Sequence, residues 1–339
     1  MLSRPDLARQ GRRRRFPRRA REDIRCPAVK IATAEGTSGG TRDRDAEPSS
    51  CYLCSGGALR LRFPARGAEA PDLRAYACTS FGHRSHGPIW GCMSCGFLFQ
   101  WPVPAVARLL EAYGAVEDQL YLSEKENRYL TFRRALGLLG PPGGRRLLDV
   151  GAYCGFFVDV ARQAGFAAEG IELSRWAVRE AGALGLPVRN ESLSERARSG
   201  ATYDLLTMWD VVEHLPDPRQ ELLAARSLLR PGGELHVSTI DALSLLARAL
   251  GARWPWLMEM HVIYFDRRTL PRLLEETGFR VRELRAYTHT VSADYLLRKA
   301  AASFPALAPA LAVVRKLVPG RWPVPVNLGD NMVVTAIRR

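Results

Sequence analysis

Four cysteines in two short pairs are the clearest chemical signal in the sequence. The pairs are Cys51-x-x-Cys54 and Cys92-x-x-Cys95, and 37 residues lie between them. A Cys-x-x-Cys turn brings two thiolates to one ion, and two such turns complete a tetrahedral site. Because four thiolates leave no open position, the pattern predicts a structural zinc site. A redox-active thiol pair is the competing interpretation, which the presence of two pairs disfavours.

Two turns further along the chain have residues that suit the binding of a nucleoside cofactor. The apolar segment Arg146–Val150 contains Asp149 and runs into Gly151, with Gly155 four positions later. Glycine at a strand-to-helix turn lets the backbone approach a ligand where a Cβ would clash. Glu172 ends the next strand candidate, 21 residues after Gly151. A carboxylate at that position can accept hydrogen bonds from two ribose hydroxyls.

An acidic, aromatic and histidine-bearing segment follows the strand candidate Leu205–Met208. It contains Trp209, Asp210, Glu213 and His214. An unperturbed imidazole titrates near pH ~6.5, so His214 is the candidate general base, and Glu213 can orient it or bind a cation. A histidine that only makes structural hydrogen bonds in a loop is the alternative.

Alternating short strands and helices must position these side chains. The predicted strands are Arg146–Val150, Ala167–Ile171, Pro187–Val188, Leu205–Met208 and Leu235–Ser238, and the predicted helices are Gly155–Ala164, Trp176–Leu184 and Arg219–Leu229. This alternation predicts a parallel sheet with helices on both faces. Such folds bind ligands in the crevice at the carboxyl ends of the strands.

The composition changes along the chain and suggests six segments. We predict a disordered basic extension (1–48), a zinc ribbon (49–104), a helical linker or lid (105–140), a cofactor-binding core (141–291), an amphipathic helical insertion (292–325) and a final sheet strand (326–339). The breaker Gly140–Gly144 marks the start of the core.

The order of these motifs resembles class I S-adenosylmethionine-dependent methyltransferases, especially those with an EHLPDP-like segment and an LRPGG turn. Here the two motifs are Glu213–Pro218 and Leu229–Gly233, and the resemblance covers Leu147 to Thr239 well. It implies a Rossmann-like α/β fold that binds S-adenosylmethionine. The second cysteine pair and its surroundings are similar to the N-terminal ribbon of several bacterial methyltransferases that act on sugars or other small molecules.

The resemblance implies that six residues hold the cofactor: Asp149, Gly151, Gly155, Glu172, Trp209 and Asp210. The first three shape the methionine end of the pocket, the glutamate holds the ribose, and the last two line the methionine and sulfonium side. Tyr153 stands where the family usually has glycine, and Glu191 lies near the position of an acid that binds the adenine amine.

Two further groups are candidates for the acceptor side. Asp210, Glu213 and His214 resemble a divalent metal cluster of some quinone O-methyltransferases, and such oxygen and imidazole ligands suit Mg²⁺ or Mn²⁺. His261 and Tyr264 lie in a stretch that can line the acceptor pocket or pack as core.

The net charge of +14 bears on the choice of partner. Met1 to Pro48 contains 13 Arg and Lys against 7 Asp and Glu, which suits either a solvated tail or a grip on nucleic acid. The apolar and cationic segment 292–317 suits either a helical insertion packed on the sheet or contact with a membrane surface. No stretch approaches the ~20 apolar residues of a membrane span, and no apolar region follows the N-terminal arginines as in a signal peptide. With seven cysteines, an odd number, we expect a cytoplasmic protein.

Methyl transfer from S-adenosylmethionine to a small molecule, such as a sugar or polysaccharide precursor, is therefore the predicted function, on oxygen or carbon. An RNA methyltransferase that uses the ribbon and the basic tail is the first alternative. A non-catalytic scaffold that keeps the fold is the second.

Overall fold

The computed structural model describes residues 47–67, 77–79, 85–103, 114 and 116–339. The chain divides into two compact units, Met1–Glu35 and Gly36–Arg339, and every described residue belongs to the second. The predicted basic extension thus lies outside the described residues except for its last two positions. Part of the predicted ribbon and linker also lies outside them.

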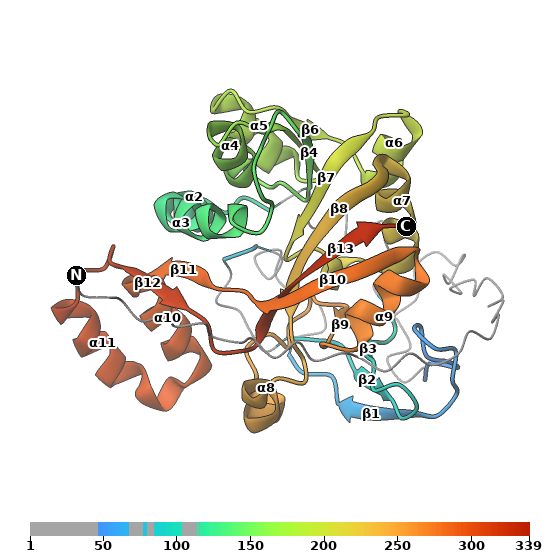
Figure 1. Cartoon of the computed structure of the whole chain (residues 1–339). Coiled ribbons are helices and arrows are strands. Elements are labelled where there is room, and N and C mark those ends of the chain that lie inside the picture. The colour runs from blue at the N-terminus through green and yellow to red at the C-terminus, as the bar shows by residue number, and fades with distance from the viewer. Residues whose placement is uncertain (1–46, 68–76, 80–84, 104–113, 115) are drawn as a thin grey trace, which may run out of the picture. The chain divides into compact units, whose positions relative to one another are not determined.

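A seven-stranded sheet with the order β10-β13-β8-β7-β4-β5-β6 forms the centre of this unit (Figure 1). Its strands are β4 (Arg146–Val150), β5 (Ala167–Glu172), β6 (Val188–Asn190), β7 (Tyr203–Trp209), β8 (Leu229–Ile240), β10 (Phe279–Ala286) and β13 (Asn331–Arg338). Strands β4 to β8 are parallel, whereas β13 runs antiparallel between β8 and β10. The predicted Rossmann-like α/β sheet is confirmed.

Consecutive apolar residues of the central strands point to opposite faces of the sheet. Leu147 and Leu205 pack on one face and Leu148 and Leu206 on the other, as the two-residue period of a strand requires. The first face is covered by α3 (Lys125–Leu136), α4 (Phe156–Gln163) and α5 (Arg175–Ala183), and the second by α6 (Leu193–Arg198), α7 (Pro218–Leu228) and α9 (Thr269–Glu276) (Figure 1). Both faces are buried, which explains why the strands read as continuous apolar runs.

The cysteine-rich segment forms a second sheet that includes a strand from the core. Its antiparallel order is β1 (Leu59–Phe63), β2 (Ile89–Cys92), β3 (Leu98–Gln100) and β9 (Ile263–Tyr264). Buried Phe97 and Phe99 share one apolar cluster with Leu206 of the large sheet. The ribbon is therefore continuous with the core.

The predicted helical insertion folds into a helical hairpin closed by two strands. Strands β11 (His289–Ser292) and β12 (Pro323–Val326) pair antiparallel, and between them lie α10 (Ala293–Ser303), η4 (Pro305–Leu307) and α11 (Ala308–Leu317). The remaining short elements are α2 (Gln119–Ser123), η2 (Val212–His214), α8 (Leu245–Leu250) and η3 (Gly251–Arg253). No helix in the described part of the chain has the length and apolar character that crossing a membrane takes.

One predicted boundary differs from the structure. The sequence places a Pro-Gly-Gly turn between a helix and the strand Leu235–Ser238, but β8 begins at Leu229 and includes the turn residues. The register of β8 against β7 shifts between Leu229 and Glu234, where Gly232 has a φ of 75°. The glycine absorbs the bulge, so the strand continues through it.

Candidate functional site

The glycine loop lies at the carboxyl end of β4, where the sheet order changes direction. Gly151 and Gly155 have φ values of 70° and 76°, which glycine adopts at little cost. A Cβ on Gly151 would lie 2.7 Å from Val211 Cγ2, and one on Gly155 would lie 3.0 Å from Leu186 Cδ1. The positive φ strains a side chain at either position, and at Gly151 a Cβ would also clash with Val211. Tyr153 between them has a φ of 48°, which is strained for a residue with a Cβ.

Glu172 joins this loop to the end of β5. Its Oε2 accepts a hydrogen bond of 3.0 Å from the Tyr153 N–H, and its Oε1 accepts 2.8 Å bonds from the Leu173 and Ser174 N–H groups. Burial raises the pKa of the Glu172 carboxyl, although the three N–H donors oppose this shift. The backbone thus holds the carboxyl group beside the glycine loop, and Oε2 keeps a lone pair for a further donor.

Asp149 lies beneath the loop and not on its surface. Its buried carboxyl accepts a 2.6 Å hydrogen bond from Thr207 Oγ1, between β4 and β7. Burial raises the pKa of Asp149 to about 8. The residue therefore supports the pocket from below.

Trp209 ends β7 and forms an aromatic wall with Tyr287. The two rings are stacked with centroids 5.6 Å apart and an angle of 8° between their planes. The indole Nε1 of Trp209 is buried and has no hydrogen-bond partner among the described residues. Since buried N–H groups are normally satisfied, a ligand atom is a natural acceptor for this donor.

Asp210 follows in a left-handed conformation with a φ of 56°. Its N–H donates to Ser238 Oγ at 2.9 Å, and that hydroxyl donates to Asp210 Oδ1 at 2.7 Å. Its second carboxylate oxygen lies 3.6 Å from Nε2 of His289 on β11. Burial lowers the pKa of His289, although Asp210 opposes this shift. The pair puts a second imidazole beside the crevice, which the sequence analysis missed.

His214 on η2 and His261 face each other, with ring centroids 4.8 Å apart. Nδ1 of His214 lies 2.8 Å from the Met260 carbonyl oxygen, and Nδ1 of His261 lies 3.0 Å from the Trp256 carbonyl oxygen. A carbonyl oxygen only accepts, so each of these Nδ1 atoms donates. Burial lowers the pKa of His214, which keeps the ring neutral near pH 7.

Glu213 completes a group of three with the two histidines. Glu213, His214 and His261 offer ligand atoms that all lie within 4.8 Å of one another. Oε2 of Glu213 is buried without a hydrogen-bond partner among the described residues, and burial, with the nearby charge of Asp210, raises the pKa of Glu213 to about 8. The structure thus groups Glu213 and His214 with His261, whereas the sequence analysis grouped them with Asp210.

An aromatic wall built from the segment after β8 lies next to this group. Asp330 accepts hydrogen bonds from the indole N–H groups of Trp254 (3.1 Å) and Trp256 (2.9 Å). The Trp256 ring stacks against His261 at 6.2 Å, and Nζ of Lys299 on α10 lies 3.9 Å from the Trp256 ring centroid. Burial, with the charge of Arg128, lowers the pKa of Lys299 to about 7.

Tyr264 lies in the core, where its ring stands edge-on to His261 with centroids 6.3 Å apart. It is fully buried, and its hydroxyl lies 3.4 Å from the Met258 carbonyl oxygen. His261 joins the Glu213 and His214 group directly, and Tyr264 packs against His261 from the core.

Arg128 on α3 is a second cation that the sequence analysis missed. Its guanidinium lies 4.9 Å from the centroid of the Tyr121 ring, whose edge contacts the ring of Tyr153 in the glycine loop. In the described part of the chain, no carboxylate lies within ion-pair distance of it. Arg128 sits in a helix without a motif, so only the tertiary structure reveals its place beside the loop.

The four cysteines come together as the spacing predicts. Sγ of Cys51 lies 3.6 Å from that of Cys95, and Sγ of Cys54 lies 3.6 Å from that of Cys92. Four sulfurs at ~2.3 Å from a central zinc ion would be about 3.8 Å apart. Burial acts to raise the pKa of Cys92, but the N–H groups of Cys95 and Ser94 outweigh it and lower this pKa to about 7. The cluster is thus shaped for a tetrahedral metal ion.

The ribbon contacts both segments that bear the histidines. The Tyr52 hydroxyl donates to Asp217, which caps α7, and accepts a 2.9 Å hydrogen bond from the Arg219 N–H. The Gln100 side chain donates to the carbonyl oxygens of Met258 (3.1 Å) and Glu259 (3.2 Å). The ribbon therefore helps to position the His214 and His261 segments.

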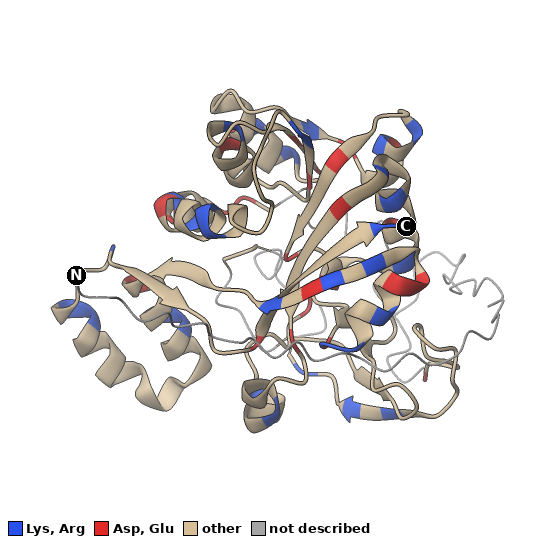
Figure 2. Ribbon diagram, viewed as in Figure 1, with Lys and Arg blue, Asp and Glu red and all other residues tan. Residues whose placement is uncertain are grey.

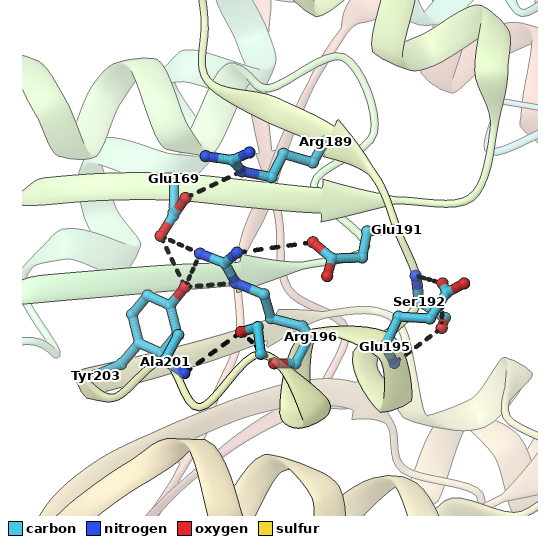
Figure 3. Close-up of polar contacts among 9 residues, drawn as sticks. Glu169, Arg189, Glu191, Ser192, Glu195, Arg196, Ala201 and Tyr203 are labelled. Atoms are coloured by element: carbon cyan, nitrogen blue, oxygen red, sulfur yellow. Dashed lines mark hydrogen bonds and ion pairs between the residues drawn. The ribbon is translucent and has the colours of Figure 1, made fainter.

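The acidic residues near β6 take part in a network of ion pairs and hydrogen bonds (Figure 3). Glu191 lies 3.8 Å from the guanidinium of Arg196, which also contacts Glu169 at 2.6 Å. The Tyr203 hydroxyl donates to Glu169 at 2.7 Å, so the network joins α6 to β5 and β7. The Glu191 carboxylate thus lies beside Arg196, and its contact with the adenine amine stays a prediction.

The strand order of the large sheet and the glycine loop at its switch point define a Rossmann-like α/β domain. Residues 121–284 match the family model described as a methyltransferase domain. This stretch, a little under half of the chain, is therefore similar to methyltransferase domains.

Known proteins share parts of this chain. A ubiquinone biosynthesis O-methyltransferase from Ralstonia nicotianae is 33% identical over 123 residues, which make up 34% of this chain and 52% of that protein. The protein of the same name from Thiobacillus denitrificans is 28% identical over 163 residues, 44% of this chain and 70% of that protein. The chain thus spans about half the length of the Ralstonia protein. A solved SAM-dependent methyltransferase from Archaeoglobus fulgidus is 16% identical and aligns with a TM-score of 0.44, over 65% of this chain and 100% of that one.

Proposed function

We propose that the protein transfers a methyl group from S-adenosylmethionine to a hydroxyl of a small molecule. The observation that carries this proposal is the Glu172 carboxyl fixed against the glycine loop, at the carboxyl ends of β4 and β5. An acid and a glycine elbow at this point suit a nucleoside with an amino-acid end.

On the donor side, Glu172 accepts hydrogen bonds from the ribose and Gly151 gives room to the methionine moiety. Arg128 lacks a carboxylate partner among the described residues and lies above Tyr121 beside the loop, so it is suited to the methionine carboxylate. Trp209 and Asp210 flank the reacting end, where the sulfonium supplies an activated methyl group. These side chains fix the donor for an in-line displacement.

On the acceptor side, His214 is the proposed general base. Its imidazole takes the hydroxyl proton as the acceptor oxygen forms its bond to the methyl carbon, and the sulfur keeps the electron pair of the broken bond. Glu213 and His261 lie within reach of the same point. The aromatic rings of Trp256 and Tyr287 favour a flat acceptor ring.

The names of the relatives agree with O-methylation of a small molecule, and we propose a hydroxylated ring compound as the acceptor. A sugar or polysaccharide precursor is the acceptor predicted from the sequence, and it remains an alternative. A cytoplasmic location also remains a prediction.

A divalent cation is the alternative occupant of the Glu213, His214 and His261 group. One carboxylate and two imidazoles whose Nδ1 atoms are held by carbonyl oxygens form a suitable donor set. Activity that is lost with a chelator and restored by Mg²⁺ or Mn²⁺ would favour the cation over direct proton transfer to His214.

We also propose a structural zinc ion at Cys51, Cys54, Cys92 and Cys95. Support comes from the two 3.6 Å sulfur–sulfur distances, which fit a closed tetrahedral site. Such an ion takes no part in the chemistry, because no coordination position is open.

Calorimetric titration with S-adenosylmethionine tests the donor site. The parent protein should bind it, and Glu172→Gln should bind at least tenfold more weakly, because it loses charged hydrogen bonds worth ~1.5–3 kcal/mol. Glu275→Gln, an exposed change on α9, serves as the matched control. A parent that does not bind would leave only the scaffold alternative.

Tracing the radiolabelled methyl group in a host extract tests the acceptor class. Label in a small-molecule fraction supports the proposal, and label in RNA would overturn it in favour of the RNA alternative. In a purified reaction, His214→Gln should lower kcat without changing the dissociation constant of S-adenosylmethionine.

A further inference from the structure

The hairpin of α10 and α11 exposes an unusual amount of apolar surface. Of the fourteen exposed large hydrophobic residues in the described part of the chain, seven lie within residues 304–328. They are Phe304, Leu307, Val313, Val314, Leu317, Trp322 and Leu328. Leu317 is 78% exposed and Trp322 is 61% exposed. Exposed apolar side chains that are concentrated in one region often mark an interaction surface.

The exposed residues of this hairpin follow a helical stripe. Val314 and Leu317 lie three positions apart on one side of α11, and Leu307, at the N-cap, precedes Val314 by seven positions. None of the residues of α11 is buried. The stripe therefore has no core to cover within the described chain.

The opposite side of α11 faces α10 and packs along it. A groove of about 250 Å³ between the two helices is lined by Arg298, Ala301, Ala308, Ala312 and Arg315. Arg315 forms a 2.6 Å ion pair with Asp294 at the start of α10. The hairpin is thus held internally and presents its apolar stripe outward.

The charges of the hairpin have one dominant sign. Residues 291–328 contain five basic side chains and one acid, Asp294. Figure 2 shows the hairpin as tan ribbon with blue positions and little red. Lys316 and Arg321 have no ion pair among the described residues. The exposed apolar stripe is therefore accompanied by cations that are open to an anionic partner.

The inner side of the same hairpin reaches the candidate active site. Tyr295 on α10 is buried. Lys299, one turn later, lies over the ring of Trp256, which belongs to the aromatic wall next to His261. The hairpin therefore has one side at the acceptor pocket and the other side exposed.

We propose that the outer face of the α10–α11 hairpin docks on an anionic phospholipid surface. Leu317 and Trp322 enter the boundary between head groups and acyl chains, and Lys316 and Arg321 lie at the level of the phosphates. Amphipathic helices with this combination of apolar and basic residues bind membrane surfaces, and each basic residue near an anionic leaflet adds ~1 kcal/mol. A second copy of the chain is a poorer occupant, since docking two like-charged faces would bring cations together.

Co-sedimentation of the full chain with vesicles tests this proposal. The protein should sediment with vesicles that contain phosphatidylglycerol and stay largely in solution with pure phosphatidylcholine, and added salt should weaken binding. The double variant Leu317→Glu with Trp322→Glu should bind at least tenfold more weakly. Both side chains are exposed, so the fold should persist. Leu223→Glu, an exposed leucine on α7, is the matched control and should bind like the parent.

Two results would overturn the proposal. Undiminished binding of the double variant would assign the membrane contact to another segment, such as the arginine-rich N-terminus. Absence of vesicle binding together with a concentration-dependent dimer that the double variant abolishes would assign the stripe to a second copy. Vesicle binding does not depend on methyl transfer, so its failure leaves the proposed activity untouched.

Discussion

The hydroxyl of Tyr52 donates a hydrogen bond to the carboxylate of Asp217, although 165 positions of sequence separate the two residues. Tyr52 lies between the first two cysteines, and Asp217 caps the helix that follows His214. The bond therefore joins the segment of the cysteine cluster to the segment that bears the proposed base.

Removing this hydroxyl should affect both stability and catalysis. Tyr52→Phe leaves the Arg219 N–H without its acceptor and takes one of two donors from Asp217, so we expect a loss of ~1–3 kcal/mol in unfolding free energy. It should also lower kcat, because the His214 segment loses one of its supports. Urea unfolding and a methyl-transfer assay measure the two effects.

Tyr129→Phe is the matched control, since Tyr129 also donates to a carboxylate, that of Asp159, but away from the ribbon. It should lose a similar amount of stability and keep its kcat. Equal kcat values in both variants would show that Tyr52 acts on stability alone.

The cysteine cluster should hold one zinc ion per chain. We expect Cys54→Ser to lose the metal and to unfold at a lower temperature, because three thiolates no longer close the tetrahedron. Elemental analysis and thermal unfolding in the presence and absence of a chelator provide the measurements. Cys78→Ser, which changes an exposed cysteine outside the cluster, should keep the full metal content. A parent protein free of zinc after purification without chelators would argue against the site.

Gly151 offers a way to separate steric from backbone strain. Gly151→Ala puts a Cβ 2.7 Å from Val211 Cγ2 and forces alanine into a φ of 70°, which alone costs ~1–2 kcal/mol. We expect much weaker binding of S-adenosylmethionine. Adding Val211→Ala removes the clash but not the backbone strain, so it should restore binding only in part. No recovery would mean that the loop conformation, and not the contact, limits binding.

Much of this site could be predicted from local patterns. The strand-to-helix turn at Gly151 and the acid at Glu172 depend on neighbours within a few residues, and the Cys-x-x-Cys spacing fixes a turn directly. The partners Lys299 and Trp256 lie 3.9 Å apart through a fold that brings α10 against a distant loop, and neither has a motif. Strand β9 contains two residues, too few for a periodic signal, so its pairing with the ribbon could not be predicted.

The stability of the protein should depend on the protonation of Asp149. Burial raises its pKa to about 8, above the ~3.9 of an unfolded aspartate, so the folded state binds the extra proton between these values. The unfolding free energy contributed by this group is therefore fully present below pH ~4 and is lost as pH rises to about 8. Asp149→Asn cannot ionise, and its amide oxygen still accepts from Thr207. The variant should thus gain stability over the parent at pH 8 and not at pH 4. Denaturant unfolding of variant and parent at pH 4 and pH 8 tests this expectation. If the difference in unfolding free energy between the two proteins is the same at both pH values, the Asp149 carboxyl ionises as readily in the folded protein as in the unfolded chain.

Lys299 should act on the acceptor and not on the donor. Its Nζ lies over the Trp256 ring, which Asp330 fixes through the indole N–H, so the cation has a defined place in the acceptor wall. Lys299→Met keeps the length of the side chain and removes the charge. We expect it to raise the acceptor KM at least fivefold while the dissociation constant of S-adenosylmethionine stays within twofold. Arg298→Met, one residue earlier in the groove between α10 and α11, should leave both constants near the parent values. If Lys299→Met instead weakens the binding of S-adenosylmethionine, the Lys299 cation belongs to the donor pocket beside Arg128.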